Sequence, residues 1–312
     1  MAHLNGDRGQ ILLVAALALA AVFVLLTVVV NSAIFTENLA SRGETVGSDE
    51  ALALRAAVVD NVGETVAYAN RHNNSDYDAL ARNVTAETAN VSAALSRHYV
   101  ADGVVVEVTG PNEFANGTRI VDENESGSTF AGADGSVANW TVATDVDGVR
   151  AYRLNVSNGS VSTFGSDDAF SLTVENDTAE WRANFTRKSG TFTVGVDGTS
   201  DDGTCQVAGS PEYVRVDLTE GTVAGEPCAP LQFARDVSSP YDVSYRNGDA
   251  VSGNYSLVVN ESGHSNDNLT DTAGTDDPYV HDAVYSADVR YRYDGPQLHY
   301  ETNVTVAPGE PE

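Results

Sequence analysis

The chain has 312 residues, with 45 acidic against 17 basic side chains and a formal net charge of −28. Such an excess of negative charge excludes a nucleic-acid binder that works by neutralising phosphates. Hydrophobic residues make up 42% of the chain, enough for a sizeable core, and its two cysteines are too few for a disulfide-dense mini-scaffold or a multi-cysteine metal protein.

The charged residues have an unusual composition. Sixteen of the basic residues are Arg and one, Lys188, is Lys, while Asp (27) outnumbers Glu (18). This composition resembles that of haloarchaeal proteins. Carboxylates spread over a surface keep it hydrated and self-repelling, which favours solubility in strong salt, where electrostatic screening is short-ranged. We therefore interpret the acidity as a property of the surface, with specific cation binding as the alternative.

One segment near the amino terminus is long and apolar. Ile11–Val30 reads ILLVAALALAAVFVLLTVVV, twenty residues without a charge. As a helix this run spans about 30 Å, one hydrocarbon core, and it exceeds the roughly 7 to 15 residues of a cleavable signal core. The run predicts a single membrane segment, with cleavage behind Ala33 as the alternative. Arg8 before it places the amino terminus in the cytoplasm and the remaining chain outside.

Glycosylation sequons support that topology. Fourteen Asn-x-Ser/Thr sequences occur, all beyond the apolar run, whereas the composition alone gives about 4 by chance. Their abundance predicts a glycosylated exterior part, and the alternative is that a chain rich in Asn and Thr forms them incidentally. The sequons begin at Asn73, Asn83, Asn90, Asn116, Asn124, Asn139, Asn155, Asn158, Asn176, Asn184, Asn254, Asn260, Asn268 and Asn303.

The residues just before the apolar run carry a family resemblance. Asp7-Arg8-Gly9-Gln10 resembles the class III signal of archaeal type IV pilin-like proteins, and Asp7–Ala40 is similar to an uncharacterised haloarchaeal family of pilin-like membrane proteins. The resemblance implies that a prepilin-type peptidase cuts between Gly9 and Gln10 and that other pilin-like subunits are partners. Bacterial-type pilins carry Glu at the position of Val14. Archaellin-like members also lack this Glu.

Beyond the membrane segment, two apolar stripes predict helices. Leu54, Val58, Val62 and Val66 recur every four residues, which is the spacing of one helix face. A second helix is expected to begin at Ser75, with Asp78 three residues on as in a capping box. Its stripe consists of Tyr77, Leu80, Ala81, Val84, Val91 and Leu95. We interpret both stripes as core packing that braces the following domain, with a partner face as the alternative.

From Val104 onward the hydrophobic period is two, which predicts about ten antiparallel strands. Asp147-Gly148, Asn247-Gly248 and Asp294-Gly295 are typical of hairpin turns. Pro111–Ser136 and Ser262–Pro278 are polar and Gly-rich, which indicates surface loops. The expected fold class is therefore α+β: a long transmembrane helix and amphipathic helices, then a mainly antiparallel β sandwich-like ectodomain. The expected parts are a leader (1–9), a transmembrane helix (10–35), a helical stalk or brace (36–102), a β-rich extracellular head (103–306) and a tail (307–312).

Cys205 and Cys228 both follow the membrane segment, where a disulfide is permitted, so a bond between them is expected, with two free thiols as the alternative. No HExxH, GxSxG, Walker or GxGxxG motif is present. Three weaker patterns have ordinary structural interpretations. These are the pair His281-Asp282, the carboxylate-rich turn Asp197–Gly203, which departs from an EF-hand, and the tyrosines Tyr285, Tyr291, Tyr293 and Tyr300, which could otherwise stack on carbohydrate.

Together these patterns predict a membrane-anchored, glycosylated cell-surface structural subunit similar to type IV pilin-like proteins. The expected partner is the lipid bilayer. No enzyme activity, cofactor, metal site, nucleic-acid partner or small-molecule substrate is expected. The alternative function is a single-span surface binding module, an adhesin or envelope receptor that does not polymerise, and a secreted enzyme is a third possibility.

Overall fold

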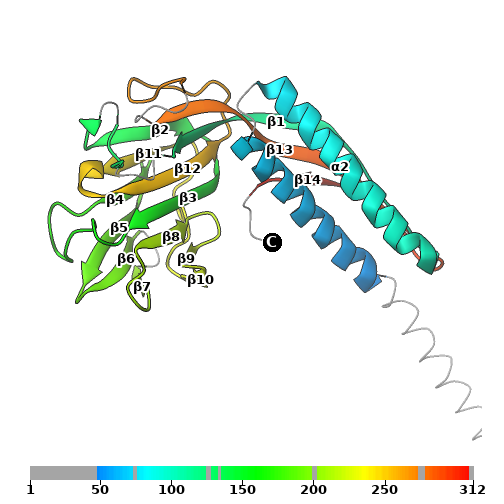
Figure 1. The fold of residues 1–312 in the computed structure, drawn as a ribbon, viewed down its shortest axis with the longest axis horizontal. Coiled ribbons are helices and arrows are strands. Elements are labelled where there is room, and N and C mark those ends of the chain that lie inside the picture. Colours follow the sequence, from blue (N-terminus) through cyan, green and yellow to red (C-terminus); the bar gives the residue numbers. More distant parts are fainter. Residues whose placement is uncertain are drawn as a thin grey trace, which may run out of the picture.

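The computed structural model describes residues 48–72, 76–123, 128–132, 135–198, 202–272 and 278–308. These residues form two α-helices followed by antiparallel strands in two sheets, as Figure 1 shows. The first helix covers residues 48–72 and the second, α2, covers Tyr77–Tyr99. The strands are β1 (Val105–Asp122), β2 (Trp140–Val146), β3 (Val149–Ser157), β4 (Ser171–Glu175), β5 (Glu180–Lys188), β6 (Thr191–Asp197), β7 (Gly203–Gln206), β8 (Tyr213–Asp217), β9 (Thr222–Val223), β10 (Glu226–Pro227), β11 (Tyr241–Arg246), β12 (Gly253–Val259), β13 (Tyr279–Asp294) and β14 (His299–Val306). Short 3₁₀ helices cover Val100–Asp102 and Gly248–Ala250.

The two sheets face each other across an apolar core. One sheet has the strand order β10-β9-β8-β3-β12-β1-β13-β14, and the other has β2-β11-β4-β5-β6-β7. Alternation along the strands turns one face of each sheet inward. The shared core includes Leu154, Leu172, Trp181, Phe185 and Tyr255, each at most 2% exposed. We call this two-sheet part the sandwich region.

The strands β1 and β13 extend beyond the sandwich and form a second core with the helices (Figure 1). The start of β1, the later half of β13 and all of β14 pack against the first helix and α2, and we call this part the brace region. The predicted stripe Leu54, Val58, Val62 and Val66 is buried there, so its interpretation as core packing is confirmed. The N-cap of α2 is Asp76, one residue after the expected capping residue Ser75, and its carboxylate accepts a hydrogen bond from the Ala79 N–H at 2.8 Å.

Helix α2 also covers an open strand edge. β12 pairs only with the last residues of β1, from Thr118 to Asp122, so the early part of β1 lacks a strand on that side. The Ser92 hydroxyl accepts a hydrogen bond from the Val108 N–H, and the Ser96 hydroxyl donates one to the Val106 carbonyl. Backbone groups that would otherwise be free for edge-to-edge association are therefore satisfied within the chain.

The predicted α+β class is wrong for the part of the chain that the structure describes. Strands dominate it, and the α contribution is limited to the two amphipathic helices of the brace region. The sequence-based class gave too much weight to the helical segments, which precede a much longer β region. The expected β sandwich-like arrangement agrees with the two facing sheets.

None of the helices in the described ranges is both long enough and apolar enough to cross a bilayer. The leader (1–9) and the expected membrane helix (10–35) lie outside those ranges.

Two of the three predicted hairpins are wrong, although their strands are correct. β2 and β3, joined by Asp147-Gly148, belong to different sheets, as do β11 and β12, which follow each other through Asn247-Gly248. These turns cross from one sheet to the other. The hairpin at Asp294-Gly295 is confirmed, since β13 and β14 pair directly.

The predicted loop Pro111–Ser136 is also wrong in its first half, because β1 continues to Asp122. Its Gly110-Pro111 pair lies at a register shift between Thr109 and Glu113, where the pairing with β13 is interrupted. A bulge tolerates a residue without an N–H donor, so the strand continues past the proline.

Candidate functional site

The junction between the first helix and β13 depends on Asn70. Its side chain is 2% exposed and bonds both backbone groups of Val284: Nδ2 donates to the carbonyl at 2.8 Å, and Oδ1 accepts from the N–H at 2.9 Å. Val284 is paired with Asn116 of β1, beside the register shift between Ala115 and Asn116, and Asn70 supports the strand at this irregularity. The helix thus fixes β13 at the point where the sandwich region passes into the brace region.

The first helix is also fixed to β13 near residue 50. The Tyr291 hydroxyl donates to the Ala51 carbonyl at 3.0 Å, and the Tyr293 hydroxyl donates to the Glu50 carboxylate at 3.0 Å. Both rings are buried in the brace core, and burial is the main cause that raises the pKa of each phenol. These tyrosines therefore serve packing and orientation, and the described part of the first helix is held to the strands near residue 50 and near residue 70.

Four arginines line an open groove on the face of the eight-stranded sheet that points away from the sandwich core. Leu154 and Tyr255 turn inward, so their neighbours Arg153 and Ser256 turn outward. The groove, of about 480 Å³, collects arginines from the first helix, β1, β3 and β8. We call it the arginine groove. Its basic side chains are Arg71, Arg119, Arg153 and Arg215, and its polar uncharged side chains are Asn155, Asn254 and Ser256.

Arg119 is the most buried of the four, at 5% exposure. Its guanidinium binds Glu123 at 3.1 Å and donates to Nε2 of His281 at 3.1 Å. Because Nε2 of His281 accepts from the guanidinium, which is a donor only, while Nδ1 donates to the Asp282 carbonyl at 2.9 Å, this ring is a neutral imidazole. Burial is the main cause that lowers the pKa of His281, and nearby Arg119 adds to the effect. His281 therefore acts as a neutral support for a buried cation, and its bond partner is Arg119 rather than the adjacent Asp282 carboxylate.

At the other end of the groove, Asp217 is shared by two arginines. Its carboxylate is 2% exposed and accepts from Arg153 at 2.6 Å, whereas Arg215 reaches the same oxygen only at 3.6 Å. Arg153 also contacts Glu220 at 3.4 Å. The Arg215 side chain is 61% exposed, so most of its guanidinium faces solvent.

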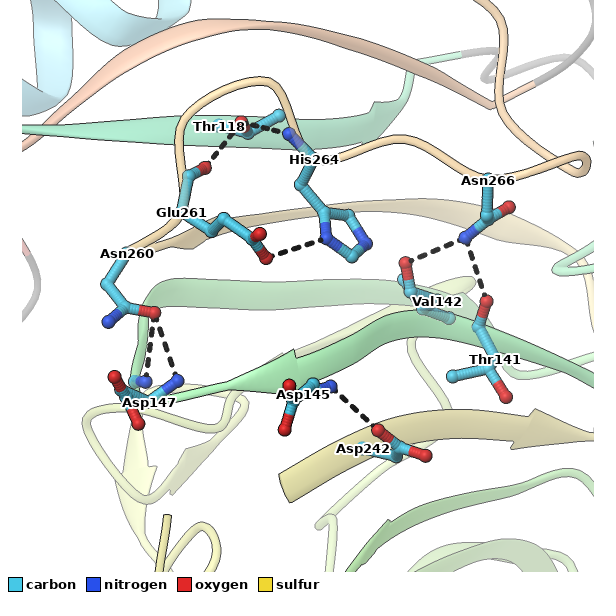
Figure 2. Close-up of polar contacts among 11 residues, drawn as sticks. Thr118, Thr141, Val142, Asp145, Asp147, Asp242, Asn260, Glu261, His264 and Asn266 are labelled. Carbon is cyan, nitrogen blue, oxygen red and sulfur yellow. Dashed lines mark hydrogen bonds and ion pairs between the residues drawn. The ribbon is translucent and has the colours of Figure 1, made fainter. Parts of the chain in front are cut away.

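A separate group of polar contacts connects the loop after β12 to β2, as Figure 2 shows. The Asn260 Oδ1 accepts from the N–H groups of Asp147 and Gly148 at 3.1 and 3.2 Å. This side chain bonds the turn in the conformation that crosses between the sheets.

In the same loop, His264 is 7% exposed and its Nδ1 lies 3.3 Å from the Glu261 carboxylate. Its buried Nε2 has no hydrogen-bond partner among the residues that the structure describes. The Asn266 side chain donates to the Thr141 and Val142 carbonyls of β2, as Figure 2 shows. Within the described ranges no group of three or more His, Cys, Asp or Glu side chains is placed to hold a metal ion.

The expected disulfide is confirmed. Cys205 and Cys228 are bonded, with their Cα atoms 5.9 Å apart. Cys205 lies in β7, an edge of the six-stranded sheet, and Cys228 directly follows β10, an edge of the eight-stranded sheet. The bond therefore joins the two sheets at the edge opposite the brace region.

The sequon asparagines differ in exposure, and their glycosylation stays a prediction. Asn158 is 8% exposed, and its Nδ2 donates to the Pro211 carbonyl. Asn73 and Asn124 lie outside the described residues. The exposed ones are Asn83, Asn90, Asn116, Asn139 and Asn303, and the half-buried ones are Asn155, Asn176, Asn184, Asn254, Asn260 and Asn268.

The predicted processing residues Gly9 and Gln10 also lie outside the described residues, as does part of the turn Asp197–Gly203. In the described part of that turn, the Gly198 N–H donates to the Asp202 carboxylate at 3.0 Å, which is an ordinary turn contact.

The fold and its polar groups define the class of protein as an antiparallel β sandwich braced by two helices. A family of unknown function, DUF7261, matches residues 5–136, a span that includes both helices and β1 and ends before β2. No curated protein and no solved structure matches the chain. Because the family has no assigned function, the pilin-like resemblance stays a prediction.

Sequence reasoning missed the arginine groove. Its outward arginines on β3 and β8 were visible within alternating segments, but Arg71 and Arg119 come from a helix and from a segment expected to be a loop. The sequence contains one general signal: the chain is strongly acidic, yet several arginines lie at polar positions of its alternating segments. That pattern does not indicate which arginines lie together.

Proposed function

We propose that the protein is a membrane-anchored, glycosylated cell-surface subunit of the type IV pilin-like kind. In this proposal the apolar run Ile11–Val30 holds the chain in the lipid bilayer, the amino terminus faces the cytoplasm and the β-rich head faces the medium. The observation that carries the proposal is the attachment of the first helix. Its described part, residues 48–72, follows the apolar run in the sequence, is packed on β13 and is hydrogen-bonded to that strand through Ala51 and Asn70.

This attachment supports a structural role because of where it lies. A head joined to its anchor by an unpacked linker turns independently of the anchor. Here the helix nearest the anchor shares a core with β1, β13 and β14, so the head and that helix move as one body. A force applied to the helix, or a neighbouring subunit bound to it, is therefore transmitted to the head.

The test of processing is amino-terminal mass spectrometry on the membrane-extracted protein. The expected mature terminus is Gln10, and Gly9→Phe is expected to block the cut while the chain remains in the membrane. A wild-type terminus at Ala2 or His3 would contradict prepilin-type processing, and one at Ile34 would indicate a secreted protein.

Topology is tested by adding protease to intact cells. We expect the head to be removed from cells whose membrane is unbroken. If the head is digested only after lysis, the exterior location is wrong.

Glycosylation is tested by glycopeptide mass spectrometry. The acceptor atom is the side-chain amide nitrogen, so we expect glycans at exposed Asn83 and Asn90 and none at Asn158, whose amide is buried and hydrogen-bonded. Thr85→Ala removes the sequon of Asn83 and should remove that glycan, whereas Ser160→Ala should leave the glycan pattern unchanged. Full occupancy of Asn158 would contradict the expected order.

The arginine groove favours a second candidate, a surface binding module that does not polymerise. The two candidates differ in assembly. Sedimentation and electron microscopy of the purified full chain should reveal helix-dependent polymers in the first case and single subunits in the second.

A further inference from the structure

We infer that the arginine groove is a binding site for oxyanion groups and that its ligand is an extended acidic saccharide bearing sulfate or carboxylate groups. The inference concerns the head alone and holds for either candidate function. It starts from the distribution of charge. With 45 acidic and 17 basic residues, most arginines of this chain are expected to meet a carboxylate, yet the groove gathers four of them with incomplete pairing.

Two of the four guanidinium groups are available to a ligand. Arg71 is exposed and forms no ion pair with any of the described residues. Arg215 is mostly exposed, and its contact to Asp217, at 3.6 Å, goes to an oxygen that Arg153 already binds at 2.6 Å. An exposed guanidinium presents N–H donors in a fork that matches sulfate and carboxylate oxygens.

The other two arginines are fixed in place. Arg119 is buried between Glu123 and neutral His281, and Arg153 is held by buried Asp217. Arg71 lies close enough to Arg119 for its charge to contribute to lowering the pKa of that guanidinium, for which burial is the main cause. Two cations held near each other attract an anion more strongly than one cation does. Arg119 is already ordered in the free protein, so binding costs it little side-chain entropy.

The acidic side chains of the groove are themselves engaged. Glu123 binds Arg119 and also accepts from the Tyr279 hydroxyl at 2.9 Å. Asp122 is 2% exposed and accepts from the Ser128 hydroxyl at 2.7 Å. These contacts hold the carboxylates beside donors of the protein itself. The side chains that face solvent in the groove are therefore mainly those of Arg71 and Arg215.

The dimensions of the groove favour an extended ligand. Arg119 is on β1 and Arg215 on β8, and between them in the sheet lie β12 and β3. Three strand spacings amount to about 14 Å, more than a single sulfate ion spans. Between the basic ends the floor consists of the side chains of Asn155, Asn254 and Ser256. Amides and hydroxyls of this kind donate to and accept from sugar hydroxyls.

The experiment uses the full chain, produced without N-glycosylation and purified in detergent, at about the ionic strength of 0.1 M salt where screening is moderate. The probes are a fluorescent dextran sulfate oligomer, the unsulfated dextran oligomer of the same length and inorganic sulfate as a competitor. We expect the sulfated oligomer to bind and the unsulfated one not to bind. Inorganic sulfate should compete only at much higher concentration than the oligomer.

Arg71→Gln and Arg215→Gln should each weaken binding of the sulfated oligomer about tenfold, the loss of one charge-assisted hydrogen bond. Both side chains are exposed, so the variants should keep the wild-type circular dichroism spectrum. The matched control is Arg97→Gln, which removes the same charge from the last turn of α2, away from the sandwich, and should leave binding unchanged (Figure 1).

Three results would overturn the inference. If the sulfated oligomer does not bind, the groove is not an oxyanion site. If Arg97→Gln weakens binding as much as the groove variants do, the attraction is non-specific. Should inorganic sulfate bind as tightly as the oligomer, the site takes a small ion and the saccharide is excluded as its ligand.

Discussion

The brace region and the sandwich region share β1 and β13 but are held together in different ways. The brace core is largely aliphatic, and its tyrosines are bonded through their hydroxyls to the first helix. The sandwich core is rich in aromatic rings packed on one another and closed by a disulfide at its far edge. The sandwich is formed by one continuous stretch of chain, whereas the brace joins segments from the two ends of the described chain. This difference suggests that the brace is the part most sensitive to single polar contacts.

The largest effect is expected from Phe185→Ala in the sandwich core. The Phe185 ring is fully buried, 5.2 Å from the Phe170 ring, and its removal should cost about 3–5 kcal/mol of unfolding free energy. Phe164→Ala, at a ring 53% exposed in the same region, is the control and should cost less than about 1 kcal/mol.

The same variant tests whether the two regions unfold together. Both tryptophans, Trp140 and Trp181, lie in the sandwich core, while both described helices lie in the brace. In a urea titration, tryptophan fluorescence therefore reports on the sandwich and far-ultraviolet circular dichroism on the brace. Because β1 and β13 run through both cores, we expect both curves to shift together. A shift in the fluorescence curve alone would mean that the regions are independent.

A smaller effect is expected from loss of the disulfide. Cys205 and Cys228 are separated by 23 positions, and closing a ring of that size stabilises the folded state by about 3 kcal/mol through the entropy of the unfolded chain. The double variant Cys205→Ser with Cys228→Ser should show this loss by urea unfolding, and reduction of the wild type should match it. An unchanged unfolding midpoint would contradict a stabilising role for the bond.

Asn70→Ala should lower the free energy of unfolding by about 2 kcal/mol, because it removes the side chain that bonds the buried N–H and carbonyl of Val284. The control, Asn61→Ala, removes an exposed side chain that bonds only within its own helix and should be close to neutral. Hydrogen exchange locates the effect: the Val284 amide should exchange faster in Asn70→Ala than in Asn61→Ala. Equal exchange rates of the Val284 amide in the two variants would contradict the role of Asn70 in holding the first helix to β13.

Much of the secondary structure follows from local patterns, and the pairing of elements does not. Alternation placed β3 and β13, and the four-residue stripe placed the buried face of the first helix. The turn Asp147-Gly148 has hairpin chemistry, but it crosses into the other sheet and its N–H groups are bonded by Asn260, more than a hundred positions later. A local signal can indicate that the chain turns there, whereas the direction of the turn depends on contacts with distant residues.

The arginine groove shows the same limit for function. Arg71 in the first helix and Arg215 in β8 are 144 positions apart in the sequence, and they reach one surface only because the helix packs on β13, which belongs to the same sheet as β8. The disulfide could be predicted because the chain offers one possible pair. A site formed by four of sixteen arginines could not, since the number of possible combinations is large and strand order is not encoded locally.

The smallest effect concerns pH at the boundary between the two regions. The pKa of His281 is lowered from 6.5, mainly by burial, so between that lowered value and 6.5 the unfolded chain binds a proton that the folded chain does not. Stability contributed by neutral His281 is therefore present above pH 6.5 and is lost as the pH falls below it. The charged and titratable groups around its ring are Arg119, Glu123, Tyr279 and Asp282.

His281→Gln separates this contribution from the titration of the many carboxylates, whose neutralisation at low pH relieves self-repulsion in both proteins alike. A glutamine amide oxygen can still accept from Arg119 but does not titrate in this range. Urea unfolding of both proteins at several pH values between 5 and 8 should therefore show the wild type losing stability relative to the variant as the pH falls. A difference that stays constant over this range would mean that His281 has the same pKa in the folded and the unfolded chain, and a relative gain of wild-type stability as the pH falls would mean that the folded ring is protonated. Either result would contradict the neutral imidazole that supports Arg119.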